Sequence, residues 1–218
     1  MTKPDNPWLN ICWENKIATC DNVFLISKGM TEKLQLDTLP EPYTGNPNAD
    51  VYCLGMNPGE KDCLFECSEE NRQLLLEYTQ KTLAHEIEDN IWNLLTEHSG
   101  YCWWRYVTRE LRKELRRDPK MFIIEYFPYH SQKGFYFPQN MPSYDYSDWL
   151  VKNAIESGKY ILAMRHTSQW TSRIKELKTY PKFFYINPKN TRCLLISREN
   201  ILKGEKCEFE IDNLLEHF

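Results

Sequence analysis

The chain has no run of about 18 apolar residues, which a membrane-spanning helix requires. Residues 1–7 also lack the apolar core of a secretory signal peptide. These two absences predict a cytoplasmic protein that makes no contact with a membrane. Its eight cysteines are therefore expected to stay reduced.

The cysteines include no C-x-x-C pair, and the nearest spacing is that of Cys63 and Cys67. No second pair mirrors this one, which disfavours a zinc or iron–sulfur site. We therefore expect neither a bound metal nor another cofactor.

An excess of positive charge is also absent, since the net charge is −4. No overall field attracts the chain to nucleic acid, so a phosphate contact needs a local basic patch. The conspicuous basic segment, residues 105–120, has its apolar residues at helical spacing and predicts an amphipathic helix. A solvent-exposed face explains its charges more simply than a phosphate contact.

Repeats and low-complexity tracts are absent, and strand and helix patterns alternate instead. Apolar runs predict strands near residues 51–54, 121–126, 160–164 and 183–186. This alternation predicts one α/β domain over residues 1–218, with three α/β/α layers and a mostly parallel, four-stranded central sheet. Residues 1–48 show no regular pattern and are expected to pack on the domain as an irregular segment.

The helices between these strands have recognisable ends. Ser68 is a candidate N-cap for a helix that extends to about residue 87. Gly158 is well placed to end a helix over residues 147–157. A further helix is expected to begin near Thr167 or Ser168.

The most informative segment follows the first strand and reads Gly55-Met56-Asn57-Pro58-Gly59. The glycines permit a tight turn and a close approach to a ligand, while Pro58 restricts the conformation of Asn57. Ligands of parallel α/β sheets lie at the carboxyl ends of the strands, so Asn57 is a candidate active-site residue. A turn without chemistry is the simpler interpretation of this motif alone.

Polar residues follow the other three predicted strands as well, at Glu125 to Ser131, Arg165 to Ser168 and Asn187 to Arg192. If the strands are parallel, these ends meet at one edge of the sheet. We therefore expect a shared pocket whose contributors are Asn57, His166 and Asn187, with Pro128 and Tyr129 on its rim. His166 is a candidate hydrogen-bond donor to a leaving group, and a purely structural role is its alternative.

The order of these features resembles the uracil-DNA glycosylase superfamily. The segment Gly55–Gly59 is similar to the first motif of its mismatch-specific and single-strand-selective branches. Residues 187–192 are similar to the start of the second motif in the mismatch-specific branch. The resemblance spans about residues 50–200 and implies a three-layer α/β/α fold that hydrolyses the bond between a base and deoxyribose without a metal.

The resemblance also implies site residues. Asn57 would orient the attacking water, and the flipped base would stack on an aromatic ring such as Tyr126, Phe127 or Tyr129. Core packing is the alternative for each ring, and the aromatic segment 127–138 is either a stacking surface for single-stranded nucleic acid or an ordered lid. With Asn57 and His166 as catalytic candidates, the candidate substrate-binding residues are Gly55, Met56, Pro58, Gly59, Glu125, Pro128, Tyr129, Asn187, Pro188 and Arg192.

Two positions depart from the family pattern. Residues 189–191 replace the serine of the second motif, and Glu125 stands where the family often has an asparagine that reads the base. An ionised Glu125 only accepts hydrogen bonds and would repel the carbonyl oxygens of uracil, whereas a base with an exocyclic amino group, or a protonated Glu125, fits better. We therefore expect weak or absent activity on uracil, which Glu125→Asn would raise. The alternative is that residue 125 faces away from the site.

Three functions follow from these observations. The first is a divergent uracil-DNA-glycosylase-like hydrolase that acts on the N-glycosidic bond of a base in DNA or a nucleotide. The second is a non-catalytic relative that binds nucleic acid or a nucleotide at the same sheet edge. The third is an unrelated α/β enzyme or binding protein in which the Gly55–Gly59 segment is accidental.

Overall fold

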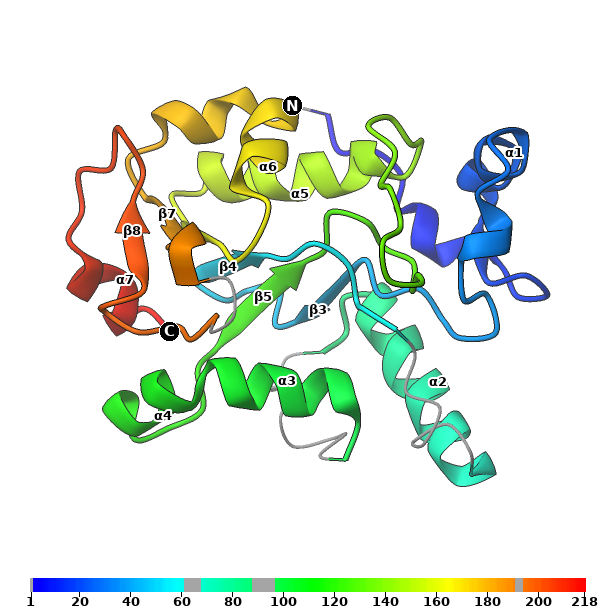
Figure 1. Cartoon of the computed structure of the whole chain (residues 1–218), viewed down its shortest axis with the longest axis horizontal. Coiled ribbons are helices and arrows are strands. Elements are labelled where there is room, and N and C mark those ends of the chain that lie inside the picture. Colours follow the sequence, from blue (N-terminus) through cyan, green and yellow to red (C-terminus); the bar gives the residue numbers. More distant parts are fainter. Residues whose placement is uncertain (1, 61–67, 88–96, 191–193) are drawn as a thin grey trace.

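A six-stranded mixed sheet forms the centre of the molecule (Figure 1). The structure is a computed structural model, and it describes residues 2–60, 68–87, 97–190 and 194–218. The strand order is β3-β5-β4-β6-β7-β8. The strands are β3 (Tyr43–Gly45), β4 (Val51–Leu54), β5 (Met121–Ile124), β6 (Tyr160–Ala163), β7 (Phe183–Ile186) and β8 (Ile201–Lys203).

The four predicted strands are β4 to β7, and they lie next to one another in parallel. The sheet has six strands rather than the predicted four, because β3 and β8 add antiparallel edges. Each edge strand has only three residues. Segments this short carry too few side chains for a recognisable alternation of apolar and polar residues.

Helices cover both faces of this sheet (Figure 1). Side chains of α3 (Ser99–Val107), α4 (Arg109–Leu115) and α7 (Ile211–Glu216) pack on one face, and α2 (Glu69–Leu83) contributes to the same core. Side chains of α5 (Tyr144–Glu156) and α6 (Thr167–Arg173) pack on the other. All residues of β4, β5 and β6 are buried, as expected for strands with both faces covered.

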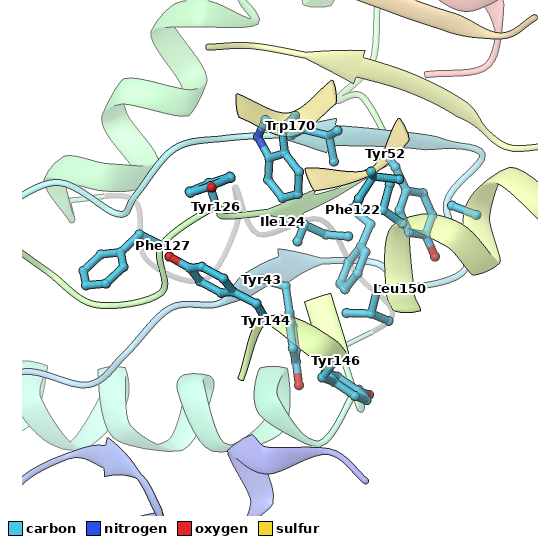
Figure 2. Packing of buried hydrophobic residues seen from close by; sticks show 14 of the residues in the cluster. Tyr43, Tyr52, Phe122, Ile124, Tyr126, Phe127, Tyr144, Tyr146, Leu150 and Trp170 are labelled. Carbon is cyan, nitrogen blue, oxygen red and sulfur yellow. The ribbon is translucent and has the colours of Figure 1, made fainter. Parts of the chain in front are cut away.

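The core beneath α5 and α6 is rich in aromatic rings (Figure 2). Tyr52 and Phe122 of the sheet meet edge to face, with ring centroids 5.1 Å apart. Tyr126 and Trp170 meet in the same way at 5.3 Å. Such pairs contribute about 1 kcal/mol each beyond the burial of their area. The Tyr126–Trp170 pair holds the carboxyl end of β5 close to α6.

The expectation that residues 1–48 are irregular is wrong in part. The segment contains the hairpin of β1 (Ile11–Cys12) and β2 (Ile17–Ala18), the helix α1 (Thr19–Ser27) and the edge strand β3. Asp21 of α1 is fully buried, and its carboxylate accepts hydrogen bonds from the Tyr129 hydroxyl at 2.8 Å and the Ser143 backbone N–H at 2.9 Å. These long-range contacts, rather than any local pattern, fix the segment on the domain.

Several predicted helix ends are confirmed. Ser68 caps α2 by accepting a hydrogen bond from the Asn71 backbone N–H at 3.0 Å, and Gly158 follows α5 with a φ of +70°. The predicted basic helix is divided into α3 and α4 at Thr108, whose hydroxyl donates to the Trp104 carbonyl at 2.8 Å. The connection from Cys63 to Cys67 lies outside the described residues.

Candidate functional site

A cavity of about 260 Å³ lies at the carboxyl ends of three neighbouring parallel strands. Its walls include residues 55–59 after β4, Glu125 after β5, and Met164 and Arg165 after β6. From β4 the chain continues to β5, which lies on one side of it in the sheet, and from β6 it continues to β7, which lies on the opposite side. The strand order therefore reverses between β4 and β6. Ligands of open α/β sheets bind at such a switch point, so this cavity is the candidate site.

The turn of the Gly55–Gly59 segment is held from both sides. The Trp170 indole N–H donates to the Gly55 carbonyl at 2.8 Å, and the Phe127 backbone N–H donates to the Met56 carbonyl at the same distance. Gly59 has a φ of +88°, a conformation that other residues rarely adopt. The wall that carries Asn57 is therefore rigid.

Asn57 is half-buried beside the cavity. Its amide nitrogen donates a hydrogen bond to the Ser131 hydroxyl at 3.3 Å, which fixes the orientation of the amide. The carbonyl oxygen of this amide has no hydrogen-bond partner within the described parts of the chain. It is available to accept a hydrogen bond from a water molecule or a ligand.

Glu125 lines the same cavity, so the alternative that it faces away is wrong. The residue is only 8% exposed, and its Oε2 atom has no hydrogen-bond partner among the residues described. A Cβ atom on Gly55 would lie 2.2 Å from this oxygen. The carboxyl group therefore occupies space that only a glycine at position 55 leaves open.

The environment of Glu125 favours its neutral form. Burial raises the pKa of its carboxyl group to about 8; the charge of Glu41 acts in the same direction and that of Arg165 opposes it. At neutral pH the group is mainly a protonated acid, which has one donor and one acceptor. The repulsion of uracil expected for an ionised Glu125 therefore applies only above about pH 8.

Glu41, in the same cavity wall, shows the opposite shift. Burial alone would raise its pKa, but His130, whose Nε2 lies 3.7 Å from Oε1 of Glu41, and the charge of His98 lower it below the ordinary range. One cavity thus holds an ionised and a neutral carboxyl group. Pairs of this kind commonly divide acid and base roles.

Aromatic and cationic side chains lie at the cavity and continue along α3. Trp103 lines the cavity, is 36% exposed, and has the Arg165 guanidinium 5.7 Å from its ring centroid. Tyr106 is 47% exposed, with the Arg109 guanidinium 4.2 Å from its ring centroid. This surface, formed by Trp103, Tyr106, Arg109 and Arg165, is called the α3 strip below.

The pocket predicted to contain Asn57, His166 and Asn187 is divided into two neighbouring cavities. The second, of about 610 Å³, has walls that include His166, Asn187 and Pro188, and it shares Met164 and Arg165 with the first. His166 has a φ of +51° and precedes α6 as its N-cap residue. The Asn187 side-chain oxygen accepts a hydrogen bond from the Lys189 backbone N–H at 3.0 Å, so this part of the amide serves its own turn.

Pro128 and Tyr129 are buried rather than placed on a rim. The Tyr129 hydroxyl donates to Asp21 and accepts from the Ala18 backbone N–H at 3.1 Å. Tyr126, a proposed stacking residue, is only 6% exposed in the core. Arg192 lies outside the described residues.

The aromatic segment 127–138 mostly packs inward. Phe135 and Phe137 lie 5.0 and 5.2 Å from Phe127, measured between ring centroids. Tyr136 alone among these rings is well exposed, at 75%. This packing matches the interpretation of the segment as an ordered connection better than that of a stacking surface.

Sequence reasoning missed several contributors to the first cavity: Glu41, His98, Tyr101, Trp103 and Trp104. Glu41 lies between two prolines in a loop, and no local pattern marks it. His98 is 3% exposed and caps α3, its Nδ1 accepting a hydrogen bond from the Gly100 backbone N–H at 3.3 Å. The only available signal was the aromatic density of residues 101–106.

The described residues hold no group of three or more His, Cys, Asp or Glu side chains that could bind a metal ion. Within residues 2–60, 68–87, 97–190 and 194–218, no helix is long and apolar enough to cross a membrane. No protein-family model, curated protein or solved structure matches this chain.

Proposed function

We propose that this chain is a divergent relative of the uracil-DNA glycosylase superfamily that hydrolyses the N-glycosidic bond of a base in DNA or a nucleotide. One observation carries the proposal: all five residues of the Gly55–Gly59 segment line a cavity at the switch point of the parallel strands. In the resembling family this motif supplies the residue that orients the attacking water. The Asn57 amide is fixed by Ser131, and its oxygen, without a partner among the residues described, suits that role.

The charges of the cavity suit this reaction. Cleavage builds positive charge on the sugar and negative charge on the departing base, and fixed charges and dipoles that match them lower the barrier. In this proposal the ionised Glu41 stabilises the sugar and the neutral Glu125 donates a hydrogen bond to the base. Asn57 holds the water that attacks the sugar carbon.

The size of the cavity limits the ligand. Its volume of about 260 Å³ is below the ~300–1,000 Å³ of most small-molecule sites, which favours a single base over a whole dinucleotide. A base in DNA must leave the stack to enter such a site. The exposed ring of Trp103 is placed where a neighbouring base can stack, with Arg165 beside it for a phosphate.

The test uses single-stranded and duplex oligonucleotides that each contain one uracil, hypoxanthine, or methylated or oxidised base. Abasic sites are detected by strand scission in alkali. We expect scission at one or more of these bases, and a loss of about 100-fold in Asn57→Ala because the water is no longer oriented. Asn153→Ala, on the exposed face of α5, is the matched control and should keep the wild-type rate.

A binding protein without catalysis is the second candidate, favoured by the departures from the family at residues 189–191. It predicts a mobility shift of the same oligonucleotides with no abasic sites. If no substrate shows strand scission or a mobility shift, both candidates are contradicted.

A further inference from the structure

Resting on the proposed function, we infer that Glu125 selects ligands by pairing, as a neutral acid, with a ring edge that has one hydrogen-bond donor beside one acceptor. Edges of this class are the N–H and C=O of a lactam, or the ring nitrogen and amino group of an aminopyrimidine. A ring whose edge has acceptors only cannot make both bonds.

The geometry around Glu125 supports this assignment. The residue is more than nine-tenths buried, lines the cavity, and keeps an oxygen without a partner among the described residues. An unpaired buried polar atom costs about 1–3 kcal/mol, a cost that a ligand can remove by pairing with it. The terminal torsion of a glutamate is broad, so the carboxyl group can turn its oxygens toward a ligand without backbone movement.

The charged groups around Glu125 determine the pH range over which it can select ligands. The charge of Glu41 disfavours the ionised form of Glu125, whereas that of Arg165 favours it. The pKa of the neighbouring Cys53 thiol is raised by burial and by the charge of Glu125. The other titratable side chains in the described cavity wall are His98, Tyr101 and Glu60. Since the pKa of Glu125 is about 8, pairing should persist at neutral pH and fail in alkali.

The test measures binding of free methylated bases, so it needs no bond cleavage. Titrations followed by NMR compare 1-methylcytosine with its analogue that carries two methyl groups on the amino nitrogen, and 1-methyluracil with 1,3-dimethyluracil. We expect the first member of each pair to bind at about pH 6, and the second to bind at least tenfold more weakly because its donor is gone. Equal binding within both pairs, or no binding by any ligand, would overturn the inference.

The pH profile separates recognition from a structural role. For 1-methylcytosine, which keeps its neutral form over this range, the wild-type affinity should fall about tenfold between about pH 6 and about pH 9. In Glu125→Gln, whose amide keeps one donor and one acceptor, the affinity should change less than about twofold over the same range. A variant that still loses affinity in alkali would show that another group titrates.

Glu125→Leu should lose binding at both pH values while its circular dichroism matches that of the wild type. If this variant fails to fold, the comparison of Glu125→Gln with the wild type still decides the question. Selective binding without base excision would leave the inference standing and contradict the proposed hydrolase. Excision without this selectivity would support the proposed hydrolase and contradict the inference.

Discussion

Gly55 and Glu125 depend on each other, although 70 positions separate them in the sequence. The carboxyl group of Glu125 lies where a side chain at position 55 would begin. The glycine of the Gly55–Gly59 segment therefore does more than permit a turn, because it leaves the space in which the buried acid sits. Both residues were candidates from the sequence, but their contact requires the pairing of β4 with β5.

This contact predicts the effect of Gly55→Ala. The new Cβ would lie 2.2 Å from Oε2 of Glu125, so the carboxyl group must move or the backbone must shift. We expect a loss of about 1–3 kcal/mol in the free energy of unfolding, as for other overpacked sites. In a Glu125→Ala background the same substitution should cost less than half as much, as measured by urea denaturation. Equal costs in the two backgrounds would contradict the contact.

A second prediction concerns the dependence of stability on pH. The pKa of Glu125 rises from the ordinary 4.5 to about 8 in the folded protein, so the folded state holds a proton that the unfolded state has lost. Its ionisation therefore adds no cost below about pH 4.5 and destabilises the fold increasingly up to about pH 8. Glu125→Gln removes this cost and should be more stable than the wild type at about pH 9, by at most about 5 kcal/mol.

Urea denaturation of both proteins at about pH 5 and about pH 9 measures this difference. The exposed Glu156→Gln, on α5, is the control and should show no pH-dependent gain. An advantage of Glu125→Gln that stays constant with pH would mean that the carboxyl group ionises normally.

Among the elements, the long apolar strands could be predicted and the site-forming loops could not. The runs 51–54 and 183–186 match β4 and β7 because fully buried strands consist of continuous apolar residues. The segment that includes β3 and Glu41 has no such pattern. Its position follows instead from the pairing of β3 with β5 and from a hydrogen bond between the Glu41 backbone N–H and the Pro128 carbonyl. Glu41 and Thr44 therefore reach the cavity wall through tertiary contacts.

The helix α3 shows the same limit. The amphipathic helix predicted over residues 105–120 overlaps only the last turn of α3, where the buried Val107 agrees with that pattern. Trp103 and Tyr106 nevertheless remain on the surface, each with an arginine near its ring. Helical spacing alone did not indicate that this exposed face continues from a cavity on the sheet edge.

The α3 strip yields a prediction for single-stranded DNA. Stacking of a base on an aromatic ring is worth about 1–3 kcal/mol, so Trp103→Ala should weaken the binding of a short single-stranded oligonucleotide about tenfold or more. Tyr136→Ala removes an even more exposed ring, from the 127–138 segment, and should change the affinity less than twofold. Fluorescence anisotropy measures both variants, and equal losses would place the contact elsewhere.

At the scale of the whole molecule, the charge distribution restricts how DNA can bind. The net charge is −4 with a sequence pI of about 5.8, so the protein as a whole repels a polyanion. Attraction must come from local cations, and two of them, Arg109 and Arg165, lie beside exposed rings in the α3 strip. Arg109 already has a carboxylate neighbour, since its Nε lies 3.3 Å from Oε1 of Glu110.

This balance predicts an unusually weak dependence of DNA binding on salt. Each phosphate neutralised in single-stranded DNA contributes about −0.7 to the slope of log affinity against log salt concentration, so two arginines give a slope of about −1.4. Arg165→Gln should reduce the slope by about 0.7, whereas Lys178→Gln, in the 3-10 helix Lys175–Thr179 that packs on the opposite face of the sheet, should leave it unchanged. Anisotropy titrations at several salt concentrations give these slopes directly. A wild-type slope steeper than about −4, or one that Arg165→Gln leaves unchanged, would mean that the DNA follows a basic surface other than the α3 strip.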